Sequence, residues 1–216
     1  MNQKVQLELD HVFILVEPYG EIADLLVDAG LQESFSRDHP GQGTSNRRFE
    51  FSNGMLEILW IRDEKEALNG PGKDLKLVER SKDKTACPFG IIVRKSDSNY
   101  SQLPFKGWPY QPDYFKKPMS FHIGDNSTNI QEPLCIYPPF IEASPFYSTN
   151  SNLPSIEKAI IHTPVKHLSL QYETIRSANR IEIIESDQHL LELTLNNQQK
   201  NKIINFMPQL PLIIHF

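Results

Sequence analysis

Alternating hydrophobic and polar positions divide the first 61 residues into extended segments and one short helix. Residues 7–16 are apolar on both alternating faces, which is typical of a strand covered on both sides. Apolar positions at helical spacing follow in residues 22–29, and Gly30 is placed to end that helix. Three further strands are predicted at residues 31–37, 47–51 and 55–61, with an Asn-Gly turn between the last two. The predicted order is β-α-β-β-β.

The rest of the chain predicts shorter strands and more turns. Residues 62–87 are charged and turn-rich, with one helix around residues 75–80. Short proline-bounded strands are predicted at residues 88–94, 108–115, 119–124 and 133–137, and they resemble a degraded copy of the first unit with a poor helix. Further strands are predicted at residues 166–172, 180–185, 189–195 and 210–216. The expected organisation is a first module at residues 1–65, a connector at 66–87, a degenerate second module at 88–140, a loop at 141–160, and a β-rich C-terminal segment at 161–216 packed on the same domain.

Composition excludes several classes of protein. The 216 residues carry a formal net charge of −5, which argues against a polycation that coats nucleic acid. No apolar run approaches the roughly 18 residues of a membrane-spanning helix, so we expect a soluble, cytoplasmic protein with no membrane partner. The two cysteines, Cys87 and Cys135, lack neighbouring ligands, which argues against a disulfide framework or a cysteine zinc site.

Two ionisable residues occupy positions where strand alternation predicts hydrophobic ones. His11 shares the parity of Leu9 and Phe13, and Glu57 lies in the apolar strand at residues 55–61. A buried carboxylate without a partner costs several kcal/mol, so Glu57 requires a metal, a histidine, an arginine or a ligand hydroxyl. If the first and fourth strands are close, His11 and Glu57 point into one cavity and form half of a Zn²⁺, Fe²⁺, Mn²⁺ or Ni²⁺ site.

An equally weighted alternative is that these two residues have a structural role. Glu57 would then pair with Arg47 or Arg48 on the neighbouring strand, and His11 would be a core histidine with its hydrogen bonds satisfied.

The polar segment at residues 39–48 is the second candidate. Its two glycines allow backbone N–H groups to approach a ligand, while the side chains of Gln42, Thr44, Asn46 and one arginine offer directional hydrogen bonds to a carboxylate or carbonyl oxygen. The alternative is a polar turn whose arginines solvate a sheet face. His122 is a weaker candidate that could reach a central cavity.

The sequence resembles the glyoxalase-like branch of the vicinal oxygen chelate superfamily. The resemblance is carried by residues 9–14, 39–49 and 55–60, and more loosely by later segments. It implies an α+β fold of paired βαβββ modules that form a curved mixed sheet around a cavity, with an additional C-terminal β-rich segment. Metal-dependent members use a His or Glu on the first strand and a Glu on the fourth strand of each module, and His11 and Glu57 match these positions. The second module departs from that pattern, because its corresponding positions are Phe89 or Gly90 and Cys135, Ile136 or Tyr137.

The resemblance leads to three functional hypotheses. In the first, the protein is a divalent-metal-assisted lyase, isomerase or dioxygenase acting on a small oxygenated substrate, with Glu57 as the catalytic residue and His11, Glu57 and His122 as metal ligands. The substrate would be bound by His39, Gln42, Thr44, Asn46, Arg47, Arg48 and Trp60. In the second, the protein binds or sequesters a ligand without metal or other cofactor, and Phe49, Phe51, Trp60, Trp108 and Tyr110 line its pocket. In the third, side chains fill the core and the protein acts through its surface or as a homodimer. Residues 160–216 would complete the second module, form a partial third one or mediate association, and the apolar strand at residues 210–216 favours association because it needs covering.

Overall fold

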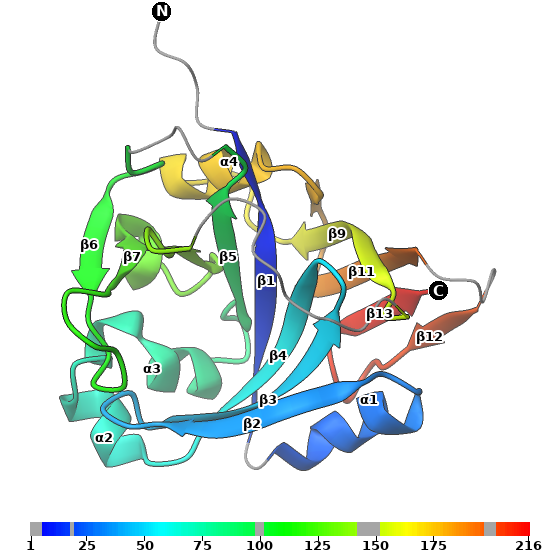
Figure 1. Ribbon diagram of the computed structural model, residues 1–216, viewed down its shortest axis with the longest axis horizontal. Coiled ribbons are helices and arrows are strands. Elements are labelled where there is room, and N and C mark those ends of the chain that lie inside the picture. The colour runs from blue at the N-terminus through cyan, green and yellow to red at the C-terminus, as the bar shows by residue number, and fades with distance from the viewer. Residues whose placement is uncertain (1–5, 18–19, 98–101, 142–151, 197–201) are drawn as a thin grey trace, which may run out of the picture.

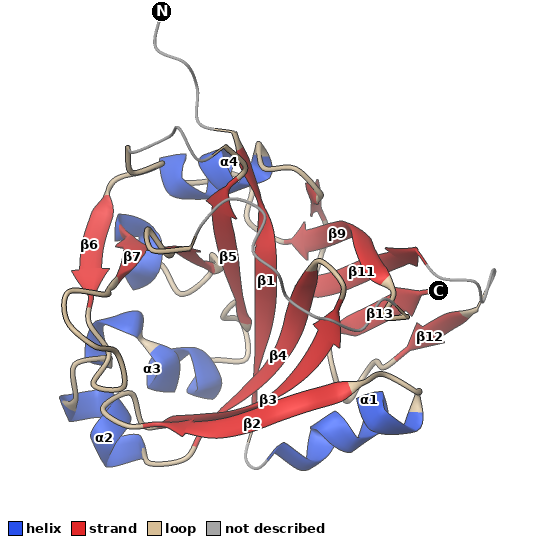
Figure 2. Ribbon diagram, viewed as in Figure 1, coloured by secondary structure: helices blue, strands red, loops and turns tan. Residues whose placement is uncertain are grey.

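Two β-sheets dominate the computed structural model, which describes residues 6–17, 20–97, 102–141, 152–196 and 202–216 (Figures 1 and 2). The larger sheet has eight strands in the order β2-β3-β4-β1-β5-β8-β7-β6. Its strands are β1 (Leu7–Val16), β2 (Glu33–His39), β3 (Thr44–Phe51), β4 (Gly54–Ile61), β5 (Phe89–Lys95), β6 (Gly107–Tyr110), β7 (Phe121–Gly124) and β8 (Leu134–Tyr137).

The eight-stranded sheet consists of two halves with the same strand arrangement. In each half the first strand pairs in parallel with the fourth, β1 with β4 and β5 with β8. The two first strands, β1 and β5, pair antiparallel at the centre. This arrangement confirms the predicted curved mixed sheet of paired modules. In the second half, the described residues between β5 and β6 form no helix, in agreement with the poor helical pattern there.

The helices are short and lie around the sheets (Figure 2). The first half contributes the 3-10 turn η1 (Gly20–Ala23) and α1 (Asp24–Asp28). The connector forms α2 (Glu64–Asn69), η2 (Lys73–Leu75) and α3 (Leu77–Lys82), and η3 (Asp125–Thr128) precedes β8. Among the described residues, no helix has the length and apolar character needed to cross a membrane.

The C-terminal segment forms a separate five-stranded sheet in the order β10-β9-β11-β13-β12. It comprises β9 (Ser155–Thr163), α4 (Leu170–Arg176), β10 (Ile181–Glu185), β11 (Leu190–Asn196), β12 (Ile203–Asn205) and β13 (Leu212–His215).

Two sequence predictions for the C-terminal segment were wrong. The strand predicted at residues 166–172 does not form. Residues 166–169 precede α4 and residues 170–172 begin it, where the Ser169 hydroxyl caps the helix by accepting a hydrogen bond from the Tyr172 N–H. The loop predicted at residues 141–160 includes the beginning of β9, while its residues 142–151 lie outside the described part of the chain.

The five-stranded sheet packs against one face of the eight-stranded sheet, here called the outer face. Apolar side chains from both sheets, α1 and α4 form one continuous core, which includes Leu9, Phe51 and Ile161. The Asn53 side chain adds two hydrogen bonds across this contact, one from its amide to the Ile156 carbonyl at 3.0 Å and one from the Ile156 N–H at 2.8 Å. The opposite, inner face of the eight-stranded sheet therefore remains available for a site.

Candidate functional site

A register change in β1 turns His11 towards the inner face. The pairing with β5 shifts between Leu9 and His11, so β1 contains one extra residue at this point. As a result Leu9 belongs to the outer core, whereas Asp10, His11 and Phe13 line a cavity on the inner face. The prediction that Leu9 and His11 share a face was wrong, because the extra residue reverses the alternation of the side chains.

The cavity lies between the two halves of the sheet and has a volume of about 210 Å³. The first half supplies its polar wall and the second half an almost entirely apolar one. The polar wall is made by Asp10, His11, Arg37, His39, Gln42, Arg48 and Glu57. The apolar wall is made by Ile92, Tyr110, Tyr114, Phe115, Phe121, Ile123, Leu134, Ile136, Phe140 and Ile141.

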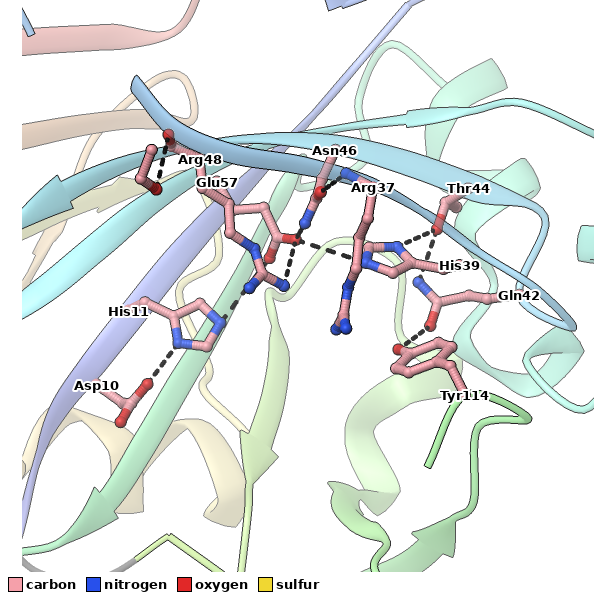
Figure 3. A network of polar contacts seen from close by, with 11 residues as sticks. Asp10, His11, Arg37, His39, Gln42, Thr44, Asn46, Arg48, Glu57 and Tyr114 are labelled. Carbon is pink, nitrogen blue, oxygen red and sulfur yellow. Dashed lines mark hydrogen bonds and ion pairs between the residues drawn. The ribbon is translucent and has the colours of Figure 1, made fainter. Parts of the chain in front are cut away.

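Glu57 is the centre of the polar wall (Figure 3). Its carboxylate accepts a hydrogen bond from the Asn46 amide and lies 3.6 Å from an Arg48 guanidinium nitrogen. His11 Nε2 lies 3.8 Å from one carboxylate oxygen and His39 Nε2 4.0 Å from the other. Burial alone would raise the pKa of Glu57, but Arg48, the two histidines and the Asn46 amide outweigh it and lower this pKa below its usual value. Glu57 is therefore ionised at neutral pH.

Arg48 is one of the two arginines that the sequence predicted as a partner of Glu57. The structural and the functional interpretation of Glu57 do not exclude one another, because this ion pair faces the cavity.

His11 is oriented by a second carboxylate. Its Nδ1 lies 2.5 Å from Asp10 Oδ1, and the other Asp10 oxygen lies 3.2 Å from an Arg94 guanidinium nitrogen. Since an ionised carboxylate only accepts hydrogen bonds, Nδ1 carries the proton and Nε2 faces Glu57.

His39 is held by the loop that follows β2. Its Nδ1 lies 2.9 Å from the Thr44 hydroxyl, which also accepts a hydrogen bond from the Gln42 amide at 2.9 Å. The Gln42 carbonyl oxygen in turn accepts from the hydroxyl of Tyr110 at 3.1 Å and that of Tyr114 at 3.4 Å. Burial lowers the pKa of His39 to about 4 despite the opposing charge of Glu57, so the imidazole is neutral at neutral pH.

Gln42 and Thr44 therefore position His39 and connect the two halves of the sheet. The glycines of this loop have a conformational role: Gly41 and Gly43 have φ values of 80° and 71°, which favour glycine. A Cβ atom at Gly43 would lie 2.3 Å from the Asp63 carbonyl oxygen. These contacts explain the two glycines without a ligand.

Arg37 belongs to the site although it was not among the predicted residues. It lies on β2 two residues before His39, so both side chains point to the same face, and its guanidinium lies 4.7 Å from the centre of the Tyr114 ring. Its buried Nε–H donates to no partner among the described residues. The i, i+2 spacing from His39 is the sequence signal that could have identified it.

Three predicted site residues lie away from the cavity. Arg47 points to the outer side, where its guanidinium binds Glu33 and Asp24, each at 2.6 Å. Trp60 packs on Gly20, where a Cβ atom would lie 2.5 Å from the indole ring. His122 lies between the cavity-lining Phe121 and Ile123 in β7, and so faces the opposite side of the strand.

The contacts of His122 show a packing role. Its Nε2 lies 2.8 Å from the Phe105 carbonyl oxygen, and its ring stacks on that of Phe105 at 5.4 Å. Two of the predicted pocket aromatics, Phe49 and Phe51, are buried in the outer core, whereas Tyr110 does line the cavity.

The donors around Glu57 do not fit a divalent metal ion. The two imidazoles approach different oxygens of the same carboxylate, and the Arg48 guanidinium lies 3.6 Å from one of these oxygens. As far as the structure describes the second half, it adds only hydrocarbon and aromatic groups to the cavity apart from two tyrosines. Over the described ranges of the chain, no three His, Cys, Asp or Glu residues are grouped in a way that could hold a metal. A cation here would also face the positive charges of Arg37 and Arg48.

Comparison with known proteins identifies similar folds. No protein-family model and no curated protein matches the chain. A hypothetical protein from Staphylococcus aureus of known crystal structure superposes with a TM-score of 0.60 at 12% identity, over 97% of this chain and 98% of that protein. A hypothetical protein from Bacillus halodurans C-125 (TM-score 0.40, 14% identity, 61% and 93% coverage) and a methylmalonyl-CoA epimerase (0.39, 11%, 63% and 97%) are also similar.

The fold defines the class: an α+β protein whose eight-stranded sheet joins a βαβββ half to a second half with the same strand arrangement, with an added C-terminal sheet. The likeness to the Staphylococcus aureus protein extends over nearly the whole chain, so the C-terminal sheet belongs to the shared architecture. At 12% identity this likeness shows the fold and not the function.

Proposed function

We propose that the protein is a small-molecule-binding member of the vicinal oxygen chelate superfamily that binds its ligand in the inner cavity without a divalent metal. The observation that carries this proposal is the ionised carboxylate of Glu57, buried at 6% exposure on the wall of a cavity whose other side is apolar. A mixed polar and apolar cavity of this kind is typical of small-molecule sites.

The spacing of the polar groups leaves room for a ligand atom. His11 Nε2 and Glu57 Oε2 are 3.8 Å apart, which is too far for a direct hydrogen bond. A ligand hydroxyl placed beside both groups can donate its single proton either to the carboxylate or to the imidazole Nε2. Ligand oxygens are therefore expected on the first half of the sheet and the ligand body on the second half.

The experiment has a metal arm and a ligand arm. Equilibrium dialysis against micromolar Zn²⁺, Mn²⁺, Fe²⁺ and Ni²⁺ compares the wild type with the His11→Ala, Glu57→Ala double variant. We expect equal metal content in both, and an excess in the wild type would establish the metal-assisted hypothesis instead. In parallel, thermal shifts are measured for a set of small alcohols, ketones, amides and carboxylic acids, with and without EDTA.

The ligand arm includes a cavity-filling variant, Ile136→Trp, in which a large ring occupies the apolar wall. At least one compound should stabilise the wild type, with no effect of EDTA, and should fail to stabilise Ile136→Trp. If no compound stabilises the wild type, or if Ile136→Trp responds equally, the ligand is not bound in this cavity.

Proton-transfer catalysis in the same cavity is a second candidate, favoured by the Asp10–His11 contact at 2.5 Å. A carboxylate that holds Nδ1–H of an imidazole leaves Nε2 free to take a proton from a ligand. The test is proton NMR in D₂O with any compound that stabilises the protein. Exchange of a carbon-bound proton in the wild type, lost in His11→Gln with binding retained, supports catalysis, and no exchange above background contradicts it.

A further inference from the structure

We propose that the ligand of the inner cavity is a monocarboxylate with a compact apolar body, and that Arg37 anchors its carboxylate. This inference rests on the proposed binding function and adds to it the chemical class of the ligand and a specificity-determining residue.

The charges that the described residues place on the cavity wall do not balance. Arg37 and Arg48 are cationic, Glu57 is anionic, and Glu57 forms its ion pair with Arg48 at 3.6 Å. The remaining carboxylate on the wall, Asp10, lies 3.2 Å from the Arg94 guanidinium. Within the described part of the chain, Arg37 therefore has no carboxylate at ion-pair distance, and one positive charge faces the cavity without a counter-ion.

Arg37 is held in place by contacts that leave its charge unpaired. The face of the Tyr114 ring lies 4.7 Å from the guanidinium carbon, and the Phe35 ring 5.9 Å from it. Such stacking fixes the plane of the guanidinium but does not replace its hydrogen bonds. The buried Nε atoms of Arg37 and Arg48 both lack a hydrogen-bond partner among the described residues. Two incompletely satisfied guanidinium groups on one wall match a planar carboxylate, which accepts hydrogen bonds on both oxygens.

The electrostatics of Arg37 point in the same direction. Burial lowers the pKa of Arg37 and the nearby charge of Arg48 lowers it further, while Tyr114 and the Glu57 carboxylate oppose this shift without cancelling it. An anion near both groups would offset both effects.

The opposite wall specifies the rest of the ligand. Phe115, Phe121 and Phe140 form an aromatic cluster with ring centres 4.9 to 5.8 Å apart. The described residues of this wall offer no second cation, so a dicarboxylate would bury an unpaired charge against hydrocarbon. The cavity volume of about 210 Å³ corresponds to roughly seven water-sized units. It therefore suits one carboxylate attached to a single ring or a short branched chain.

The test is isothermal titration with three probes of the same shape: phenylacetate, its neutral amide phenylacetamide, and the cation 2-phenylethylammonium. Inorganic phosphate is titrated separately, since a phosphate group would also bind arginines. We expect phenylacetate to bind at least about 10-fold more tightly than the amide, and neither the cation nor phosphate to bind measurably. In Arg37→Gln the affinity for phenylacetate should fall by about 10- to 100-fold, while that for the amide changes little. Arg37→Lys keeps the positive charge but loses the planar pair of N–H donors, so its affinity for phenylacetate should lie between those of the wild type and Arg37→Gln.

The matched control is Arg47→Gln, because Arg47 lies on the neighbouring strand but points to the outer side, where it binds Glu33. Melting temperatures of all variants establish that they fold. The carboxylate assignment is overturned if the amide or phosphate binds as tightly as phenylacetate, or if Arg37→Gln behaves as Arg47→Gln does.

The Ile136→Trp variant separates the two proposals. If acid and amide bind equally and Ile136→Trp abolishes both, the cavity is a binding site but its carboxylate specificity is refuted. If no probe binds the wild type, the monocarboxylate proposal fails, and the binding proposal is decided by the wider set of compounds. If binding persists in Ile136→Trp, both proposals fail.

Discussion

Replacing His39 with glutamine should remove a large part of the acid sensitivity of the protein. His39 is 3% exposed, and its burial lowers its pKa from 6.5 to about 4 in the folded state. In the unfolded chain the imidazole returns to its ordinary pKa of about 6.5. Between these two values the unfolded chain binds a proton that the folded protein does not, so the free energy of unfolding falls as the pH falls.

The size of the effect follows from the two pKa values. The contribution is negligible above about pH 7, develops as the pH falls through the unfolded pKa, and levels off below the folded pKa. At pH 4.5 the two values predict a loss of about 2.5 kcal/mol relative to pH 7.5. This is a substantial part of the roughly 5–15 kcal/mol that stabilises a typical domain.

Urea unfolding of the wild type and His39→Gln between pH 4.5 and pH 7.5 measures this difference. The glutamine amide can still hydrogen bond to Thr44 but does not titrate, so other titrating groups largely cancel between the two proteins. The stability of the wild type should fall by about 2.5 kcal/mol more than that of His39→Gln over this range. His167→Gln, at an exposed position, serves as the control and should keep the slope of the wild type. Parallel slopes for the wild type and His39→Gln, or an NMR titration of His39 near pH 6.5, would refute the argument.

Three further predictions concern the scaffold around the cavity. Gly90→Ala should lower the free energy of unfolding by about 1–3 kcal/mol in urea, because its Cβ would lie 1.9 Å from the Phe13 ring; an unchanged midpoint would contradict this packing. Arg80→Met should cost about 3 kcal/mol or more, since the buried guanidinium donates to five backbone carbonyls around η3; a loss below 1 kcal/mol would show that these hydrogen bonds add little. Burial raises the pKa of Cys87 to about 12 and also raises that of Cys135, so neither thiol should react with Ellman's reagent until urea unfolds the protein; rapid labelling of the native protein would refute this.

The first half of the fold could be predicted from the sequence because its signals are local. A strand that is apolar on both faces, an Asn-Gly turn and a glycine-terminated helix all appear in the structure near the predicted residues. The wrong prediction of a strand at residues 166–172 arose because two local signals compete there. Leu168, Leu170 and Tyr172 alternate like strand residues, but Ser169 caps a helix, and Leu170 is 80% exposed as a result.

The site could be predicted only in part, because it depends on which face each strand turns inwards. Glu57 was identified from parity within one regular strand, and that parity holds. His122 was placed on the wrong face because neighbouring residues of a strand point to opposite sides. The short strand β7 has apolar residues on both sides of His122, so its sequence does not indicate which face lines the cavity. The place of Arg37 in the site depends on the pairing of β2 with β3. This pairing puts Arg37 opposite Asn46, which donates a hydrogen bond to Glu57. That pairing is not visible in the residues around Arg37 alone.

The C-terminal sheet allows the inner face to be a binding site. A curved sheet buries apolar residues on both faces only if something covers each of them. The outer face carries Phe49 and Phe51, both fully buried in a core shared with Ile161 and Leu193 of the five-stranded sheet. Since this sheet, α1 and α4 bury the outer face, the inner face does not have to supply the main core. Its first half can therefore bear charged residues and its second half can enclose a cavity instead of filling it. Removing the C-terminal sheet would expose the outer core and should unfold the eight-stranded sheet together with the site.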